Sequence, residues 1–488
     1  TVNIDATTYG CRVRPGYVEH ANTMAGDALK TVLPFSGSTE DGSFDRIFAA
    51  TNDGIYDITV STTSPTKVLD WPVKSSDAGW CVFSQFVNDG GDHFLLVTDL
   101  ENGYYVFDET ADTWTAATVV GPTNAIVFVT VWKGRVWLVE KDTATAWYTD
   151  LGTFQGTLTE FNFGNKFRAG GSLVALYDWT RDSGNGPDDY LVSVSSAGDV
   201  VVYAGTDPSS SATFGQIGVW FIGALPAGRR IGSQFGGDLL LLSTYGLISA
   251  NDLLQGASPF ALEGSMSWKI QPFLTETMRL TRTRLGWEVK LHPNLSKIII
   301  STPKLPTQPY LQFVFDVDLQ AWSMWEDMPM LTSEEFQGES YFGSADVRVW
   351  QIGGHMDNVT LAAPLVDCEQ IYWKLLTSYS DMGEPELWKR AHFLRPVFIS
   401  EITPTVNVRA FYDYNLDRLA DVGSSSSVLW DSAIWDSSVW PLDLPNTQKN
   451  PTGASGMGRV IAVALSGRSQ AETTLVSIGV LWDSGGML

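Results

Sequence analysis

Cysteine, positive charge and long apolar runs are all scarce in this chain of 488 residues. The three cysteines, Cys11, Cys81 and Cys368, are odd in number, widely spaced and form no CxxC pair. This spacing argues against a disulfide framework and against a zinc site. No apolar run approaches the ~20 residues that a helix needs to cross a bilayer, so no membrane-spanning segment is expected. The first residues, TVNIDATTYGCRVRPG, have neither the apolar core nor the basic leader of a secretory signal.

The shortage of Lys and Arg, 31 against 55 Asp and Glu, leaves a formal net charge of −24. Such acidity argues against a protein that wraps nucleic acid or adheres to an anionic membrane by electrostatic attraction. Apolar residues make up 44% of the chain and charged residues 18%, so the chain can bury a large core and is not mainly disordered.

Catalytic motifs are also missing from the sequence. There is no GxSxG nucleophile elbow, no HExxH, and no Gly-Lys dipeptide with which to build a phosphate loop. The fragment SSDAGW at 75–80 partly resembles the Asp-box hairpin of sialidases but does not recur. The five histidines are scattered singly. We therefore predict no enzyme activity, no cofactor and no metal site.

What the chain does contain is turn formers and aromatic residues. Its 45 Gly and 22 Pro interrupt the chain often, and 19 Trp, 16 Tyr and 24 Phe supply side chains that favour strands. The segment 46–60, RIFAATNDGIYDITV, places Asp53-Gly54 between two apolar arms, which is typical of a β-hairpin.

The same hairpin unit recurs along the chain. Turns are expected at Gly54, Gly103, Gly134, Gly198 and Gly246, with an average spacing of about 48 residues, close to the length of one propeller blade. Two more distorted units cover 297–327 and 340–354. We therefore predict an all-β fold, with a six- or seven-bladed β-propeller over residues 41–360. Residues 1–40 are expected to form an N-terminal docking segment, and residues 361–488 a C-terminal β-rich, sandwich-like domain.

Two clusters are candidate contact sites. In WDSAIWDSSVWP, Trp430, Trp435 and Trp440 recur every fifth residue, which matches neither a helix nor a strand. They predict a subunit interface, with an internal core and a glycan-stacking platform as alternatives. Basic residues gather between 279 and 304; they are either a solvated blade edge or a contact to an acidic neighbour or a phosphate backbone. The cluster comprises Arg279, Arg282, Arg284, Lys290, Lys297 and Lys304.

Several segments carry a resemblance to a known family. CRVRPGYVEHAN (11–22) with the hairpin that follows, DYLVSVSSAGDVVVYAGTDPS (189–209), WDSAIWDSSVW (430–440) and SIGVLWDSGGML (477–488) resemble the tail nozzle, or tail hub, proteins of short-tailed bacteriophages. These are also described as packaged-DNA stabilisation proteins. The family pattern implies a longer leader before the Arg-Pro-Gly segment, so we expect that this chain begins late, through processing or truncation.

The resemblance implies a structural virion protein, made in the host cytoplasm and built into the phage tail. It implies a homohexameric ring that extends the DNA channel below the portal and the head-to-tail adaptor ring, and that attaches tail fibres or spikes. Viral double-stranded DNA would pass through its lumen without specific binding, and an acidic wall would repel that DNA. The alternative is a propeller that binds or cleaves glycans of a host surface. Convergent carboxylates beside an arginine cluster on one propeller face would favour that alternative.

Overall fold

The computed structural model describes the chain apart from residues 183–186, 257–264, 362–367, 416–445, 450 and 486–488. The chain divides into two units. Unit 1 comprises Thr1–Glu19, Phe313–Met328 and Ile352–Leu488, and unit 2 comprises His20–Gln312 and Pro329–Gln351. Small antiparallel sheets make up most of the regular structure, which confirms the predicted all-β class.

Helices are few in the described ranges. They are α1 (Ala250–Leu254), α2 (Gln271–Thr281) and two 3₁₀ turns, η2 (Trp268–Ile270) and η3 (Pro293–Leu295). None of the helices that the structure describes is long and apolar enough to cross a membrane.

Seven small sheets follow one another along most of the chain. The first four are β4 (Leu29–Phe35), β5 (Arg46–Thr51), β6 (Gly54–Asp57) and β7 (Thr66–Asp70); β8 (Cys81–Val87), β9 (His93–Asp99), β10 (Gly103–Asp108) and β11 (Thr113–Ala116); β13 (Ile126–Trp132), β14 (Arg135–Glu140), β15 (Thr145–Tyr148) and β17 (Thr159–Asn162); and β18 (Leu173–Asp182), β19 (Pro187–Ser195), β20 (Asp199–Gly205) and β21 (Phe214–Phe221). A short parallel pair, β12 (Val119–Val120) and β16 (Gly156–Thr157), accompanies the third.

The last three sheets complete the series. They are β22 (Gly232–Phe235), β23 (Asp238–Ser243) and β24 (Gly246–Ser249); β25 (Glu288–His292), β26 (Lys297–Ser301), β27 (Leu311–Asp316) and β28 (Ala321–Glu326); and β29 (Met330–Phe336), β30 (Glu339–Ser344), β31 (Val349–Ile352) and β3 (Tyr17–Ala21). The fourth strand of the seventh sheet thus comes from the start of the chain.

The five predicted turns all join paired strands, so the hairpin predictions are confirmed. The β13–β14 turn shows why glycine is needed. Trp132 pairs with Arg135, and the two residues between them, Lys133 and Gly134, have φ of 48° and 71°. Two positive φ angles define the tight hairpin turn whose twist matches that of the strands.

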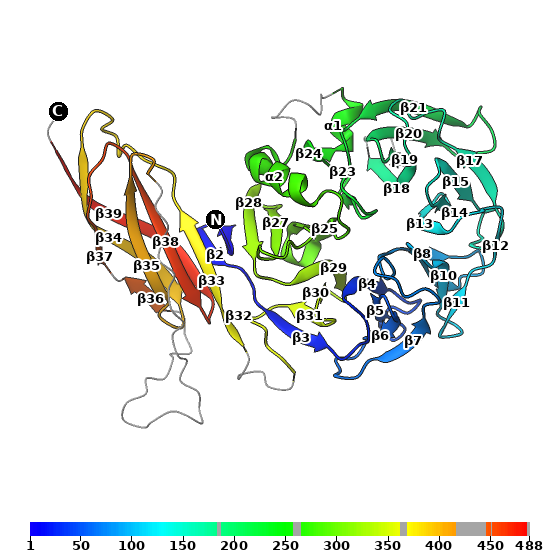
Figure 1. Cartoon of the computed structure of the whole chain (residues 1–488), viewed down its shortest axis with the longest axis horizontal. Helices are drawn as coiled ribbons and strands as arrows, with labels where there is room; N and C mark the ends of the chain where they lie inside the picture. Colours follow the sequence, from blue (N-terminus) through cyan, green and yellow to red (C-terminus); the bar gives the residue numbers. More distant parts are fainter. Residues whose placement is uncertain (183–186, 257–264, 362–367, 416–445, 450, 486–488) are drawn as a thin grey trace. The chain divides into compact units, whose positions relative to one another are not determined.

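Within unit 2, neighbouring sheets of the series pack on one another. The sixth sheet crosses the division of the chain, since β28 and most of β27 belong to unit 1. Buried apolar clusters join the first sheet to the second, the second to the third, and the third to the fourth. Leu29 and Val32 of β4 share a further cluster with Tyr341 and Val349 of β30 and β31, so the first sheet also packs on the seventh. Figure 1 shows these sheets following one another around unit 2. We call this arrangement the sheet ring.

Packing on both faces explains the sequence of the inner strands. Every residue of β9 after His93 is buried, and β23 is buried from Leu239 to Ser243. A strand covered on both faces reads as a continuous apolar run, whereas a strand with one solvated face alternates.

Two more sheets occupy unit 1. One has the order β1 (Ile4–Thr7), β2 (Gly10–Val13), β39 (Thr473–Ser484), β34 (Lys389–Ser400) and β36 (Asn446–Lys449), with β37 (Thr452–Gly453) also paired to β34. The other has the order β32 (Met356–Asp357), β33 (Glu369–Leu376), β38 (Ile461–Ser469) and β35 (Thr405–Tyr412). Trp373 and Leu465 of one sheet and Leu394 and Phe398 of the other share a single apolar core.

The expected docking segment, residues 1–40, folds as β1 to β4. Within unit 1 it is held by a buried ion pair between Arg14 and Asp357, with two bonds of 2.7 Å. The remaining donors of the Arg14 guanidinium reach Asn3, at 2.9 Å, and the backbone carbonyls of Pro15 and Glu326. All five N–H groups are therefore satisfied, as a buried arginine requires. Burial nevertheless raises the pKa of Asp357, and Arg14 opposes that shift.

Candidate functional site

The candidate contact residues from the sequence do not come together at one site among the described residues. Trp430, Trp435 and Trp440 lie outside the described residues. Arg279 is exposed on α2 and forms an ion pair of 2.7 Å with Glu276 one turn earlier. Arg282 and Arg284 are exposed just after the helix.

The rest of the basic stretch disperses. Lys290 on β25 pairs with Glu334 on β29 at 2.5 Å, Lys297 on β26 is buried, and Lys304 stacks over the ring of Tyr310. These residues lie on different elements, since Arg279 is on α2, Lys290 and Lys297 are on β25 and β26, and Lys304 follows β26. The stretch is therefore not one continuous basic patch.

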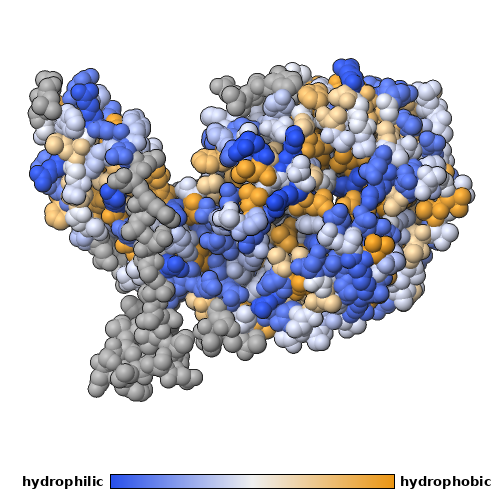
Figure 2. All heavy atoms as spheres, in the orientation of Figure 1, coloured by the Kyte–Doolittle hydropathy of each residue, from blue (hydrophilic) through white to orange (hydrophobic). Residues whose placement is uncertain are grey.

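Arg282 instead lines a hollow of about 340 Å³ within unit 2. Its wall comes from the β9–β10 turn, β18, the β19–β20 turn, and the segments 225–229 and 282–285. Apolar side chains form much of the wall, and Arg229 and Arg282 supply its charge. Figure 2 shows that hydrophilic and hydrophobic side chains intermingle on the visible face of unit 2.

The chain builds the hollow by bringing two connecting segments together. The Ala227 N–H donates to the Arg282 carbonyl at 2.7 Å, which fixes the segment before β22 against the segment after α2. Gly228 sits between them with φ of 108°, a conformation that favours glycine. Arg229 then turns back onto β18 and donates through Nη1 to the Val174 carbonyl at 2.5 Å.

The hollow is positively charged in an acidic protein. Burial lowers the pKa of Arg229 to about 10, which leaves it cationic at neutral pH. Nε and Nη2 of Arg229 and the guanidinium of Arg282 have no hydrogen-bond or ion-pair partner among the described residues. No residue described as lining the hollow carries a carboxylate. Reasoning from sequence singled out Arg282 but missed Arg229; the only available signal was the doublet Arg229-Arg230 after Pro226 in an acidic chain.

A buried charge cluster lies beside the hollow. Arg230 pairs with Glu288 at 2.9 Å and donates to the Lys30 carbonyl, while Lys290 pairs with Glu334. Burial raises the pKa of Glu334 to about 7, and Lys290 only partly opposes this shift. The cluster joins the first, sixth and seventh sheets by polar contacts.

A polar contact recurs in the first four sheets. In each, a side chain at the turn between the second and third strands accepts a backbone N–H from the segment that enters the same sheet. The acceptor and donor pairs are Asn52 with Asp27 (2.9 Å), Asp99 with Gly79 (2.6 Å), Glu140 with Asn124 (2.8 Å), and Asp199 with Ala169 (2.5 Å). Three of these acceptors are carboxylates, so part of the negative charge stabilises the fold.

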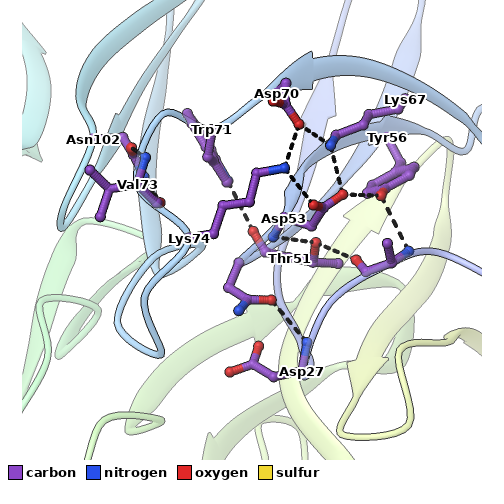
Figure 3. Close-up of polar contacts among 12 residues, drawn as sticks. Asp27, Thr51, Asp53, Tyr56, Lys67, Asp70, Trp71, Val73, Lys74 and Asn102 are labelled. Carbon is purple, nitrogen blue, oxygen red and sulfur yellow. Dashed lines mark hydrogen bonds and ion pairs between the residues drawn. The ribbon is translucent and has the colours of Figure 1, made fainter.

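Figure 3 shows the first sheet's turn, where an ion-pair cluster surrounds Asp53. Lys67 and Lys74 approach its carboxylate at 2.6 and 2.7 Å and also contact Asp70, and the Tyr56 hydroxyl donates to it at 2.7 Å. Hydrogen bonds from the two lysines hold the pKa of Asp53 well below its usual range. Burial, together with Asp53, raises the pKa of Tyr56 to about 12.

Replacing Asp53 with alanine should lower the free energy of unfolding by about 1–2 kcal/mol, because three donors lose a charged acceptor. The measurement is urea unfolding at neutral pH. Lys74→Ala is the control; Lys74 is solvent-exposed, so its removal should leave the unfolding midpoint nearly unchanged. Equal losses in the two variants would contradict the central role of Asp53.

No group of three or more His, Cys, Asp or Glu side chains that could hold a metal ion occurs in the described part of the chain. The three cysteines are free thiols, and Cys81 is fully buried. His292 is also buried, between the hydroxyls of Ser333 and Ser340, and burial lowers its pKa to about 3.

Comparison with known proteins gives little further guidance. No protein-family model matches the chain, and no curated protein matches it. Among solved structures, the chain is similar to the computationally designed Ika8 protein, with 12% identity and a TM-score of 0.38 over 69% of this chain and 99% of that chain. A likeness at this level does not decide the fold.

Proposed function

We propose that the sheet ring is a seven-bladed β-propeller and that the two sheets sharing a core in unit 1 form a β-sandwich. Seven sheets in sequence order, each packed on the next and the last on the first, support the propeller. Completion of the seventh sheet by β3 fits the same architecture, since a strand from the start of the chain then joins the last blade to the first.

We further propose that the protein is the tail nozzle, or hub, of a short-tailed bacteriophage. In this proposal it forms a homohexameric ring between the head-to-tail adaptor and the tail fibres or spikes, and viral double-stranded DNA passes through the ring. The protein acts in the virion and without catalysis.

The observation that carries the proposal is that the Arg-Pro-Gly segment resembles tail nozzle proteins. In the structure this segment also has a definite role in packing. Arg14 is the buried partner of Asp357. A Cβ on Gly16 would lie 2.0 Å from the Met356 carbonyl oxygen, so only glycine fits there. Another resembling segment, 189–209, spans the β19–β20 hairpin, so the resemblance reaches both units.

An apolar pair on unit 1 supports self-assembly. Phe393 and Leu481 are cross-strand partners on β34 and β39, and they are 51% and 60% exposed. Adjacent Gly453 has open space around its Cβ position, so a partner can approach the pair closely. Exposed apolar side chains that lie together are typical of interaction surfaces.

The glycan-active alternative is less well supported by the geometry. Most glycosidases use a pair of carboxyl groups beside the scissile bond. The hollow brings two arginines together, but none of its described lining residues is a carboxylate. This arrangement favours binding over hydrolysis.

Native mass spectrometry of the full chain at micromolar concentration tests the proposal. We expect a species of about six times the 53.5 kDa chain mass. Leu481→Asp should shift the population toward smaller species, whereas Val60→Asp, at an isolated exposed position of unit 2, should not. A chain that stays monomeric across the concentration range would contradict the proposal.

A further inference from the structure

The hollow in unit 2 is lined by charged side chains that packing of the fold alone does not require. Two arginines face it, and none of its described lining residues offers an opposing carboxylate. Asp142 favours the charged form of Arg229 but does not line the hollow, and Glu101 beside Leu100 is already paired with Lys141 at 2.8 Å. The described lining of the hollow therefore offers no carboxylate to its two arginines.

The donors of Arg229 are held in place. Nη1 is anchored on the carbonyls of Leu173 and Val174, which leaves Nε and Nη2 without a partner among the described residues. The Arg282 carbonyl is bonded to the Ala227 N–H, so its backbone is also fixed to the opposite wall. A planar guanidinium with free donors binds carboxylate and phosphate groups through paired hydrogen bonds.

Apart from Ser196 and Thr283, the remainder of the wall is apolar. Leu100, Val174, Leu225, Pro226 and Leu285 line the hollow. Its volume of about 340 Å³ lies within the range of small-molecule sites. An inorganic anion would leave most of this space unfilled, whereas an organic anion would bury its body against the leucines and its charged end against the arginines.

We propose that this hollow is a binding site for a small organic anion, an apolar body that bears a carboxylate or a phosphate, with Arg229 and Arg282 holding the charged group. The proposal does not depend on ring assembly or on a phage origin. In this proposal the sheet ring binds a ligand, whereas in the tail proposal it forms part of the wall of the DNA channel.

Isothermal titration calorimetry on the full chain tests the site with four probes: benzoate, phenyl phosphate, inorganic phosphate and benzyl alcohol. Benzoate or phenyl phosphate should bind, and comparison of the two identifies the preferred charged group. Inorganic phosphate should bind at least tenfold more weakly than the better of them, because it lacks the apolar body. Benzyl alcohol should show no binding, because it lacks the charge.

Two variants, Arg282→Gln and Ala227→Phe, test whether the probe binds in the hollow, and Arg279→Gln is their control. Arg282→Gln should weaken binding at least tenfold, whereas Arg279→Gln, one turn away and paired with Glu276, should leave it unchanged. Ala227→Phe should fill the hollow and abolish binding while both arginines remain. The proposal is overturned if neither organic anion binds the wild-type chain, if inorganic phosphate binds as well as they do, or if Arg282→Gln and Ala227→Phe both bind as the wild type does.

Discussion

Replacing Arg14 with alanine should lower the free energy of unfolding by about 3–5 kcal/mol, because Asp357 is then left as a buried carboxylate without its partner. The Arg14 side chain is fully buried and that of Asp357 is 10% exposed, so water does not compensate for the loss. The same substitution also removes the donor to Asn3, which in turn accepts the backbone N–H of Glu326 at 2.7 Å. The loss should appear as a lower urea midpoint of the transition in which unit 1 unfolds.

Arg12→Ala is the matched control for this experiment. Arg12 lies two residues away on β2, and its contact with Glu472 is 3.4 Å long with both side chains about half exposed. Exposed ion pairs of this kind contribute about 0.5 kcal/mol or less. If Arg14→Ala were as stable as Arg12→Ala, the buried pair would not hold the start of the chain in unit 1.

The second prediction with a large expected effect is that Glu334 makes the free energy of unfolding depend on pH. Its pKa is raised by burial from 4.5 to about 7, so the folded chain binds this proton more tightly than the unfolded chain does. The stability that Glu334 contributes is therefore fully present below pH 4.5 and is lost as the pH rises through about 7. A difference of this size corresponds to about 3 kcal/mol.

Glu334→Gln removes this titration. Relative to the variant, the wild type should lose about 3 kcal/mol of unfolding free energy between pH 4.5 and pH 8, measured by urea unfolding of both proteins at several pH values. Glu339→Gln, at an exposed position on β30, controls for the general loss of one carboxylate. Parallel pH profiles of the wild type and Glu334→Gln would show that burial does not shift this group.

Local features of the chain were predictable from the sequence because they depend on neighbouring residues. Lys133-Gly134 adopts the turn that its glycine requires, and the apolar arms on either side pair as expected. The antiparallel sheets followed from the same signals. The number and order of the sheets are properties of the whole chain, and the irregular spacing of the turns left six and seven units equally open.

Long-range contacts could not be predicted in this way. Arg14 and Asp357 lie 343 residues apart, and nothing in either local sequence indicates the other. Lys389 is buried, with its ammonium donating to three backbone carbonyls that its local sequence does not indicate. The hollow likewise depends on Arg229 and Arg282, which come together only when two connecting segments meet. Such sites require the tertiary structure.

The central claim is that copies of this chain enclose a channel for DNA. Electron microscopy of the purified assembly, with averaged views along its axis, tests this claim most directly. We expect a closed ring of about six copies around an open axial channel wide enough to pass duplex DNA. Single particles of one copy, or a closed oligomer with no axial channel, would contradict the account.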